Sequence, residues 1–337
     1  MRSFTSLICR RAAMVAGGLL IDRLVSDPPS RYHPVAWFGS SMNKAESMMW
    51  KDHRRAGVYY TIAGLVPSLV TAAICAWGSR GHRGVWPTRT TGMGVAPTAV
   101  AATILATTLG GRQLCDVSHK IAECLDRGDL DGARRWLPWL VGRDPSQLDE
   151  SAVAAATIES VGENAVDAVI APLFWSLAAG VPGAVAYRCI NTMDAMVGHH
   201  SDRHENFGWA SARLDDIANY VPARLWVALV SVVGPASMGT VAHGVRRDAS
   251  KHPSPNAGPA ETAVAYSLDI RLGGPVKYHY REENRPYLGQ GNRPCSTDIR
   301  RAVKLLERIE RSIMLVAGTG FVGSVGIAAI ARMRVSR

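Results

Sequence analysis

Three carboxylates recur at a fixed spacing in the stretch IESVGENAVDAVIAPLF. Glu159, Glu163 and Asp167 stand four residues apart. On an α-helix this spacing places all three on one face, with about 6 Å between neighbours. Like charges so close destabilise a helix unless a cation neutralises them, and Mg²⁺ favours carboxylate oxygens together with substrate phosphates. We expect a catalytic, magnesium-binding face here. The alternative is an acidic face that is solvated or paired with arginines from elsewhere.

A second polar stretch, residues 188–224, follows directly and gathers arginines, amides and carboxylates. Arginine forks suit phosphate or carboxylate groups, and carboxylates among them can bind a metal or orient the guanidinium groups. The alternative is an internally salt-bridged loop, for example through Arg213 and Asp216. We expect a site here, with candidates for substrate binding and for catalysis: Arg188, Asn191, Arg213, Asn219 and Arg224 in the first group, and Asp194, Asp215 and Asp216 in the second.

Two further stretches hold weaker candidates for substrate binding. In SDPPSRYHPV the prolines stiffen an extended loop that would hold Asp27 and His33 in place, although a rigid turn before an amphipathic helix is an equal alternative. SPNAG places Asn256 before a helix whose first N–H groups suit an anion. RLGGP places Arg271 beside two glycines that permit close backbone approach. Neither stretch is a P-loop, since GxxxxGK[ST] is absent.

His199, His200 and His204 suggest a zinc site at first, because the last two stand four residues apart. The HExxH pattern is absent, however, and Gly198 favours a turn. A polar loop is therefore the preferred interpretation of these histidines.

Long gaps between charged residues predict membrane-spanning helices. Residues 56–78, 90–111, 225–245 and 312–331 are uncharged, and about 20 apolar residues suffice to cross a bilayer. Residues 12–21 resemble a signal-peptide core, but no convincing cleavage site follows, so we expect an uncleaved helix. Residues 165–187 contain Asp167 and two prolines, which suggests a broken or re-entrant helix. Buried helices of a large soluble α-protein are the alternative to membrane spans.

We therefore expect an all-α polytopic membrane bundle of about five or six spans, as one membrane domain over residues 1–337. Residues 112–164 should form an amphipathic helical segment, and residues 246–311 a polar one. The net charge of +10 comes mainly from residues 244–311 and the two termini, which the positive-inside rule places in the cytoplasm. Basic stretches without interleaved aromatics argue against nucleic acid. Six cysteines without a CxxC pair argue against a disulfide scaffold.

Taken in order, these motifs resemble the CobD/CbiB family of cobalamin biosynthesis. The family's DPP, HPV and G pattern is matched at residues 27–29, 33–35 and 39, and its ESxxENxxD pattern at residues 159–167. APLF, YRxxNTxDxMVG, ARLDD and NYxPARL follow up to Leu225, and then come SPNAG, RLGGP and RPxLG. The resemblance covers about residue 12 to residue 330. The three histidines stand where the family usually has tyrosine and basic residues.

The resemblance implies a multi-pass enzyme of the cell (inner) membrane, with active segments facing the cytoplasm. It implies an ATP-dependent ligase of the adenosylcobinamide-phosphate synthase type, which joins (adenosyl)cobyric acid to aminopropanol or aminopropanol phosphate. The product is (adenosyl)cobinamide or its phosphate. ATP and Mg²⁺ are the implied cofactors. The lipid bilayer and other corrinoid-pathway enzymes are further expected partners.

Within this reaction we expect magnesium near the three carboxylates of residues 159–167, where it would neutralise phosphates. Arg188, Arg213 and Arg224 would hold the phosphate of the amine or of an acyl phosphate. Asp194 or Asp215 would take the proton from the attacking ammonium.

Two other classes of protein remain open on the sequence alone. A polytopic transporter, or a sensor like the related AmpE membrane protein, would also use an intramembrane carboxylate and a broken helix. A transporter should place its polar residues within the spans, whereas here most lie in connecting segments. A non-catalytic scaffold for corrinoid enzymes explains membrane residence but not the dense arginines and carboxylates.

Overall fold

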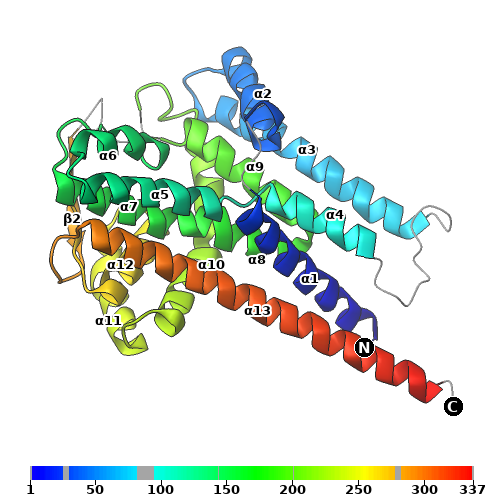
Figure 1. Cartoon of the computed structure of the whole chain (residues 1–337). Helices are drawn as coiled ribbons and strands as arrows, with labels where there is room; N and C mark the ends of the chain where they lie inside the picture. The colour runs from blue at the N-terminus through cyan, green and yellow to red at the C-terminus, as the bar shows by residue number, and fades with distance from the viewer. Residues whose placement is uncertain are drawn as a thin grey trace. The chain divides into compact units, whose positions relative to one another are not determined.

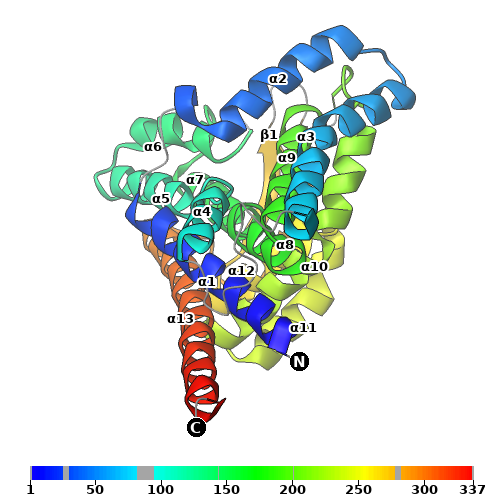
Figure 2. The same cartoon turned by 90° about the vertical axis from the view of Figure 1, so that its right-hand side faces the viewer.

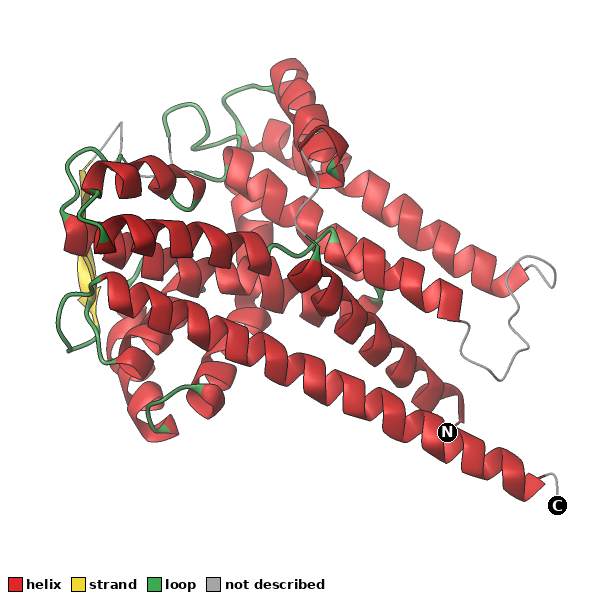
Figure 3. Ribbon diagram, in the orientation of Figure 1, coloured by secondary structure: helices red, strands yellow, loops and turns green. Residues whose placement is uncertain are grey.

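The computed structural model describes residues 2–25, 30–81, 95–142, 144–199, 201–277 and 282–335. Within these ranges the regular secondary structure is helical apart from one short hairpin, which confirms the all-α prediction (Figure 3). The α-helices are α1 Arg2–Leu24, α2 Pro34–Met49, α3 Arg54–Gly81, α4 Val95–Ala106, α5 Gly111–Asp126, α6 Leu130–Trp136, α7 Glu150–Ala165, α8 Ala171–Ala179, α9 Val181–Val197, α10 Trp209–Val233, α11 Met238–Asp248, α12 Ala257–Leu268 and α13 Ser296–Val335.

Shorter elements connect several of these helices. Three 3-10 turns are η1 Ser30–Tyr32, η2 Leu137–Trp139 and η4 Ala249–Lys251. A π-helical turn, η3 Val166–Ile170, joins α7 to α8. The strands β1 Leu272–Lys277 and β2 Glu282–Leu288 pair antiparallel, with Leu272 opposite Leu288.

The chain divides into two compact units. Unit 1 comprises residues 1–109, 172–215 and 311–337, and unit 2 comprises residues 110–171 and 216–310. Two boundaries fall within the helices α10 and α13, between Asp215 and Asp216 and between Glu310 and Arg311. A sequence pattern of apolar stretches does not reveal such a division, because both helices continue through it.

In unit 1, α1 packs along α4, and α9 packs against α2 and α3 (Figures 1 and 2). Small residues allow this close contact: a Cβ added at Gly17 would lie 2.9 Å from the Cβ of Ala102. A Cβ at Gly57 of α3 would lie 1.8 Å from the carbonyl oxygen of Phe207. One core cluster of unit 1 is formed by the buried residues Met42, Ala56, Tyr60, Met193, Val197 and Phe207.

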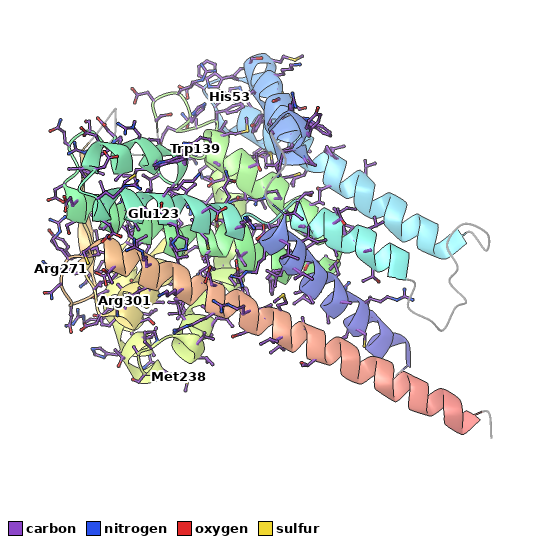
Figure 4. The ribbon with its side chains drawn as sticks, viewed as in Figure 1. His53, Glu123, Trp139, Met238, Arg271 and Arg301 are labelled. Atoms are coloured by element: carbon purple, nitrogen blue, oxygen red, sulfur yellow. The ribbon has the colours of Figure 1, made fainter. Side chains whose placement is uncertain are left out.

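In unit 2, α7 packs against α5 and α12, and α11 packs against α12. Gly162 of α7 lies against the backbone of α12, since a Cβ there would be 3.4 Å from the Cα of Glu261. Figure 4 marks Arg301 of α13, which donates to the carbonyl oxygen of Leu268 at the end of α12 over 2.8 Å. The Gly162 contact brings α7 against the first half of α12, and candidate site residues lie on α7 and immediately before α12.

The described helices match the expected spans unevenly. Residues 12–21, 56–78 and 312–331 lie within α1, α3 and α13 respectively. Residues 90–94 of the third expected span lie outside the described residues, and its remainder includes α4. Residues 165–187 are interrupted by the π-helical turn and by Gly180, whose φ is +74°. By length and mean hydropathy, α10 is the one helix of the described residues long and apolar enough to cross a membrane.

Residues 225–245 do not form the single helix that the uncharged gap suggested. The helix α10 ends at Val233, and α11 begins at Met238. Pro235 lies in the break, where it cannot continue a helix, and Ser237 caps α11 by accepting a hydrogen bond from the N–H of Thr240. Counting uncharged residues detects neither the proline that ends one helix nor the serine cap that begins the next.

A buried carboxylate, Asp248, ties together several parts of unit 2. Asp248 is fully buried. Its carboxylate oxygens accept hydrogen bonds from Arg247, Lys251, the hydroxyl of Tyr266 and the N–H of Gly289. Burial by itself would raise the pKa of Asp248, but these hydrogen bonds outweigh it and lower the pKa below its ordinary value of 3.8. The carboxylate therefore links α11 and η4 to α12 and the end of the hairpin.

Replacing Asp248 by Ala is expected to lower the free energy of unfolding by about 2–4 kcal/mol, because the buried Tyr266 hydroxyl and Gly289 N–H lose their acceptor. A carboxyl with a lowered pKa stabilises the fold above its unfolded pKa, and this contribution is lost as the pH falls through the folded pKa. The difference between wild type and variant should therefore shrink below about pH 4. Thermal unfolding of both proteins at pH 7 and pH 3 measures this; an equal difference at both pH values would contradict the assignment.

Candidate active site

Three hydrogen bonds join predicted residues within unit 2. Asn219 of α10 donates from Nδ2 to Oδ1 of Asp167 over 3.0 Å. Arg224, one turn further along α10, donates from Nη1 to Oδ1 of Asn256 over 2.8 Å. Asn256 in turn donates from Nδ2 to the carbonyl oxygen of Asp216 over 2.9 Å. The helix α10 thus joins a half-buried carboxylate on one side and the SPNAG turn on the other.

Asp167 is the second residue of the π-helical turn that follows α7. A π-turn inserts one residue into the α-helical hydrogen-bonding pattern, so the α-helical spacing of Glu159 and Glu163 does not continue through this turn. Gly110, which precedes α5, donates its N–H to the carbonyl oxygen of Ala168 over 3.1 Å. Gly110 therefore stabilises the π-helical turn, and the carboxylate of Asp167 on this turn accepts the hydrogen bond from Asn219.

Glu159 anchors the hairpin. The residue is only 2 % exposed, and Oε1 accepts a hydrogen bond from the N–H of Gly273 over 2.8 Å. Gly273 has φ of +82°, and a Cβ there would lie 2.2 Å from the carbonyl oxygen of Pro286, so this close turn requires glycine. Glu163, one turn further along α7, is exposed. The two glutamates of the motif therefore occupy very different surroundings.

The expected three-carboxylate metal site does not form as such. In the part of the chain that the structure describes, no group of three His, Cys, Asp or Glu side chains could hold a metal ion. Glu159 is buried and accepts a hydrogen bond from the hairpin, Glu163 is exposed, and Asp167 lies in the π-helical turn beside Asn219. A spacing of four residues predicts one face only for an uninterrupted α-helix.

Unit 1 holds a second polar group on α9 and the start of α10. Arg188 donates from Nε to the carbonyl oxygen of Thr108 over 2.9 Å and from Nη1 to Oδ1 of Asn191 over 3.3 Å. Asn191 donates to Oδ1 of Asp215 over 3.4 Å. Asp194 lies one turn beyond Asn191, where a Cβ at Gly198 would be 1.8 Å from its Oδ1. The salt-bridged loop considered as an alternative is therefore, in its described part, mainly two helices.

The structure gives the following positions for the other predicted residues. Asp27 lies outside the described residues. His33 caps α2, because its Nδ1 accepts a hydrogen bond from the N–H of Val35 over 3.2 Å. Arg271 is exposed beside the hairpin, with its guanidinium 5.0 Å from the ring centroid of Tyr287 (Figure 4). Arg213 is exposed on α10.

The structure adds one charged contact that sequence reasoning missed in unit 1. Glu46 of α2 lies 3.0 Å from Nε2 of His204 and 3.1 Å from Nε of Arg203. Burial would raise the pKa of Glu46, but the hydrogen bonds from His204 and Arg203 lower it overall. This contact gives His204 a partner other than a metal. No local pattern signals it, because the partners are 158 residues apart.

Unit 2 adds a buried pair that sequence reasoning also missed. The side chains of His252 and Glu261 are 4 % and 1 % exposed, and Nε2 of the histidine lies 3.8 Å from Oε1 of the glutamate. His252 stands two residues before the SPNAG turn, and Glu261 lies in the first half of α12. Glu261 falls within an apolar run of α12, and a lone carboxylate in such a run is a signal that could have drawn attention to it.

Comparison with known proteins places this arrangement in a family. The family model described as CobD/Cbib protein matches residues 15–306. The cobalamin biosynthesis protein CobD of Mycobacterium bovis is 43 % identical over 321 residues, which cover 93 % of this chain and 97 % of that protein. The proteins of the same name from Rhodobacter capsulatus and Chromobacterium violaceum are 39 % and 37 % identical, with 91 % and 93 % of this chain and 96 % of each relative covered. No solved structure matches the chain.

The match extends across both units and across most of the residues described above: α7 with η3, the polar part of α9 and α10, the SPNAG turn and the hairpin all lie between residues 15 and 306. The chain belongs to the CobD/CbiB family of cobalamin biosynthesis proteins.

Proposed function

We propose that this protein catalyses ATP-dependent amide bond formation between the free carboxylate of (adenosyl)cobyric acid and the amine of aminopropanol phosphate, or of aminopropanol. The product is (adenosyl)cobinamide phosphate or (adenosyl)cobinamide. Membership of a cobalamin biosynthesis family supports the substrate class. A carboxylate is a poor electrophile at neutral pH, so the reaction needs ATP as a co-substrate that activates it.

The observation that carries the proposal is the contact between Arg224 and Asn256. A guanidinium fork presents several N–H donors to phosphate, and it binds best when its orientation is fixed. Nη1 of Arg224 donates to Asn256 and to the carbonyl oxygen of Tyr220, and the guanidinium lies 3.8 Å from the Tyr220 ring centroid. We assign the phosphate of the amine substrate to this guanidinium.

The carboxylates of unit 2 supply the acid–base chemistry in this proposal. The attacking group enters as an ammonium and must lose a proton before nitrogen can bond to carbon. Glu163 is exposed and Asp167 is half-buried beside Asn219, so both offer a carboxylate that solvent and substrate can reach. Asp216 lies on α10 one turn before Tyr220. We propose Glu163 as the base, in place of the Asp194 or Asp215 expected from the sequence, and Asp167 as a carboxylate that orients the ammonium.

The polar group of unit 1 is proposed as a further substrate-binding element. Arg188 and Asn191 form a donor pair, and Asp215 accepts from the amide. Asp194 and Arg213 add charges of both signs on the same two helices. A corrinoid carries many amide groups, and donors and acceptors of this kind are suited to them.

A magnesium ion held by three carboxylates of this chain does not fit the described residues. Magnesium commonly binds through one or two carboxylates and substrate phosphates, with water completing its shell. We therefore propose that it arrives as part of the Mg-ATP substrate. The chain has no P-loop, so arginines and amides of the site would bind the nucleotide phosphates.

We propose that the protein resides in the cell membrane as a multi-pass protein with its polar segments at the cytoplasmic face. The helix α10 has the required length and hydropathy. On α3 the exposed side chains Val58, Tyr59, Ile62, Val66 and Val70 form one stripe, which lipid would cover. Other corrinoid-pathway enzymes are proposed partners, since they make and consume its substrates and products.

The test uses membranes that contain the full chain, with adenosylcobyric acid, Mg-ATP and either amine in parallel. Corrinoid products are separated and identified by mass. We expect a product heavier by the amine less one water, formed only with ATP and faster with the phosphorylated amine. If neither amine yields product with folded protein, the ligase proposal fails and the transporter or sensor alternative gains support.

A further inference from the structure

His252 is buried in the turn between η4 and α12, next to the residues to which we assign phosphate binding. Its side chain is 4 % exposed, and Nε2 faces Oε1 of Glu261 over 3.8 Å. Burying a carboxylate and an imidazole is costly unless each has suitable polar neighbours. Their position so close to the SPNAG turn raises the question of what the pair holds in place.

The other ring nitrogen of His252 fixes the turn itself. Nδ1 accepts a hydrogen bond from the N–H of Ser254 over 3.0 Å. A ring nitrogen that accepts carries no proton, so the neutral ring has its proton on Nε2, the nitrogen that faces Glu261. Glu261 therefore favours the tautomer that the turn requires.

Ser254 extends this order to the start of α12. Its Oγ accepts hydrogen bonds from the N–H groups of Asn256 and Ala257, over 3.2 and 3.0 Å. The packing is tight: a Cβ at Gly258 would lie 2.8 Å from the Cβ of His252 and 2.5 Å from the carbonyl oxygen of Ala249. The backbone that carries Asn256 is thus held from two sides.

Asn256 then holds the guanidinium. The residue is 7 % exposed, and its side chain is fixed at both ends, by the carbonyl oxygen of Asp216 and by Nη1 of Arg224. A displacement of the turn would move the amide oxygen and, with it, the fork of Arg224. A change of this kind alters the affinity for an anion without removing any group that touches it.

We propose that His252, oriented by Glu261, is a positioning residue for the phosphate-binding guanidinium of Arg224. It acts through the ordered turn of Ser254 and Asn256. This inference rests on the function proposed above, in which Arg224 holds the phosphate of the amine substrate.

The test is a double-mutant cycle on the full chain, with the KM for aminopropanol phosphate and the KM for adenosylcobyric acid as readouts. In His252→Asn the amide oxygen replaces Nδ1 as the acceptor for Ser254, and we expect a KM for the phosphorylated amine within about threefold of wild type. His252→Gln reaches toward Glu261 but offers no acceptor at the Nδ1 position. We expect it to raise that KM about tenfold, which corresponds to roughly 1.4 kcal/mol, and to leave the KM for the corrinoid unchanged.

The same change in an Arg224→Ala background decides whether His252 acts through the guanidinium. We expect no further increase in KM there, because coupled residues are not additive. Additive effects, or equal damage by His252→Asn and His252→Gln, would overturn the proposal. Ser254→Ala removes the next link and should reproduce the loss; it replaces His252→Gln in the cycle if that variant does not fold.

The outcomes also separate this proposal from the function on which it rests. If Arg224→Ala leaves the KM for the phosphorylated amine unchanged, the assignment of phosphate to Arg224 fails, and the positioning role fails with it. If Arg224→Ala raises that KM and neither His252→Gln nor Ser254→Ala does, only the positioning role fails.

Discussion

Replacing Glu163 by Gln is expected to lower kcat for amide formation by roughly a thousandfold, within the usual range for loss of a general base. The amide keeps the size and most of the hydrogen bonding of the carboxylate, but it cannot take a proton from the attacking ammonium. Because Glu163 is exposed on α7, the substitution should not destabilise the fold. The measurement is kcat at saturating substrates, with protein yield and thermal unfolding as checks on folding.

The matched control lies one turn away on the same helix. In Glu159→Gln the new amide oxygen can still accept the hydrogen bond from the N–H of Gly273, so we expect less than a threefold loss of kcat. Glu159→Ala leaves that buried N–H without its acceptor and should cost about 1–3 kcal/mol of stability. If Glu159→Gln is as damaging as Glu163→Gln, the Glu159 carboxylate takes part in the chemistry after all.

The second large effect concerns substrate choice. Arg224→Ala should raise the KM for aminopropanol phosphate by roughly 30- to 100-fold, the equivalent of a lost charge-assisted hydrogen bond or two. The KM for free aminopropanol should change little, because that amine has no phosphate. Arg224→Lys should fall between wild type and Ala, since an ammonium keeps the charge but not the planar fork.

The matched control for this change is Arg293→Ala. Arg293 is exposed, and its replacement removes the same single positive charge without affecting the contact between Arg224 and Asn256. It separates loss of the local guanidinium from a general decrease in positive charge, which would weaken attraction of any anionic substrate. An equal rise in KM for both amines in Arg224→Ala would show that the residue does not recognise phosphate.

The sequence allowed the helical fold class to be predicted, because long apolar stretches and amphipathic patterns are local signals. For the same reason, three of the predicted apolar spans fall within the helices α1, α3 and α13. The break between α10 and α11 was missed because the span was predicted from the absence of charged residues alone, without regard to Pro235 and the Ser237 cap. The hairpin was missed as well, since its short glycine-containing strands give too few residues for a periodic pattern to emerge.

The candidate site was predictable as a set of residues but not as a geometry. Arg224, Asn256 and Asn219 were singled out by type and spacing, and the structure gives each a partner within that set. The π-helical turn that contains Asp167 could not be foreseen from the spacing of the three carboxylates. The hydrogen bond from Gly273 to Glu159 joins residues 114 positions apart, and a local sequence pattern does not indicate contacts over such a separation.

The most direct test of the central claim follows oxygen atoms. Adenosylcobyric acid labelled with ¹⁸O in its free carboxylate is incubated with the full chain, Mg-ATP and aminopropanol phosphate, and the phosphate released is analysed by mass spectrometry. If ATP activates the carboxylate as an acyl phosphate, one ¹⁸O passes to inorganic phosphate for each amide formed, and one stays in the amide. Label in AMP would show activation as an acyl adenylate in place of an acyl phosphate. No label in any product of ATP would contradict ATP-dependent activation of the carboxylate.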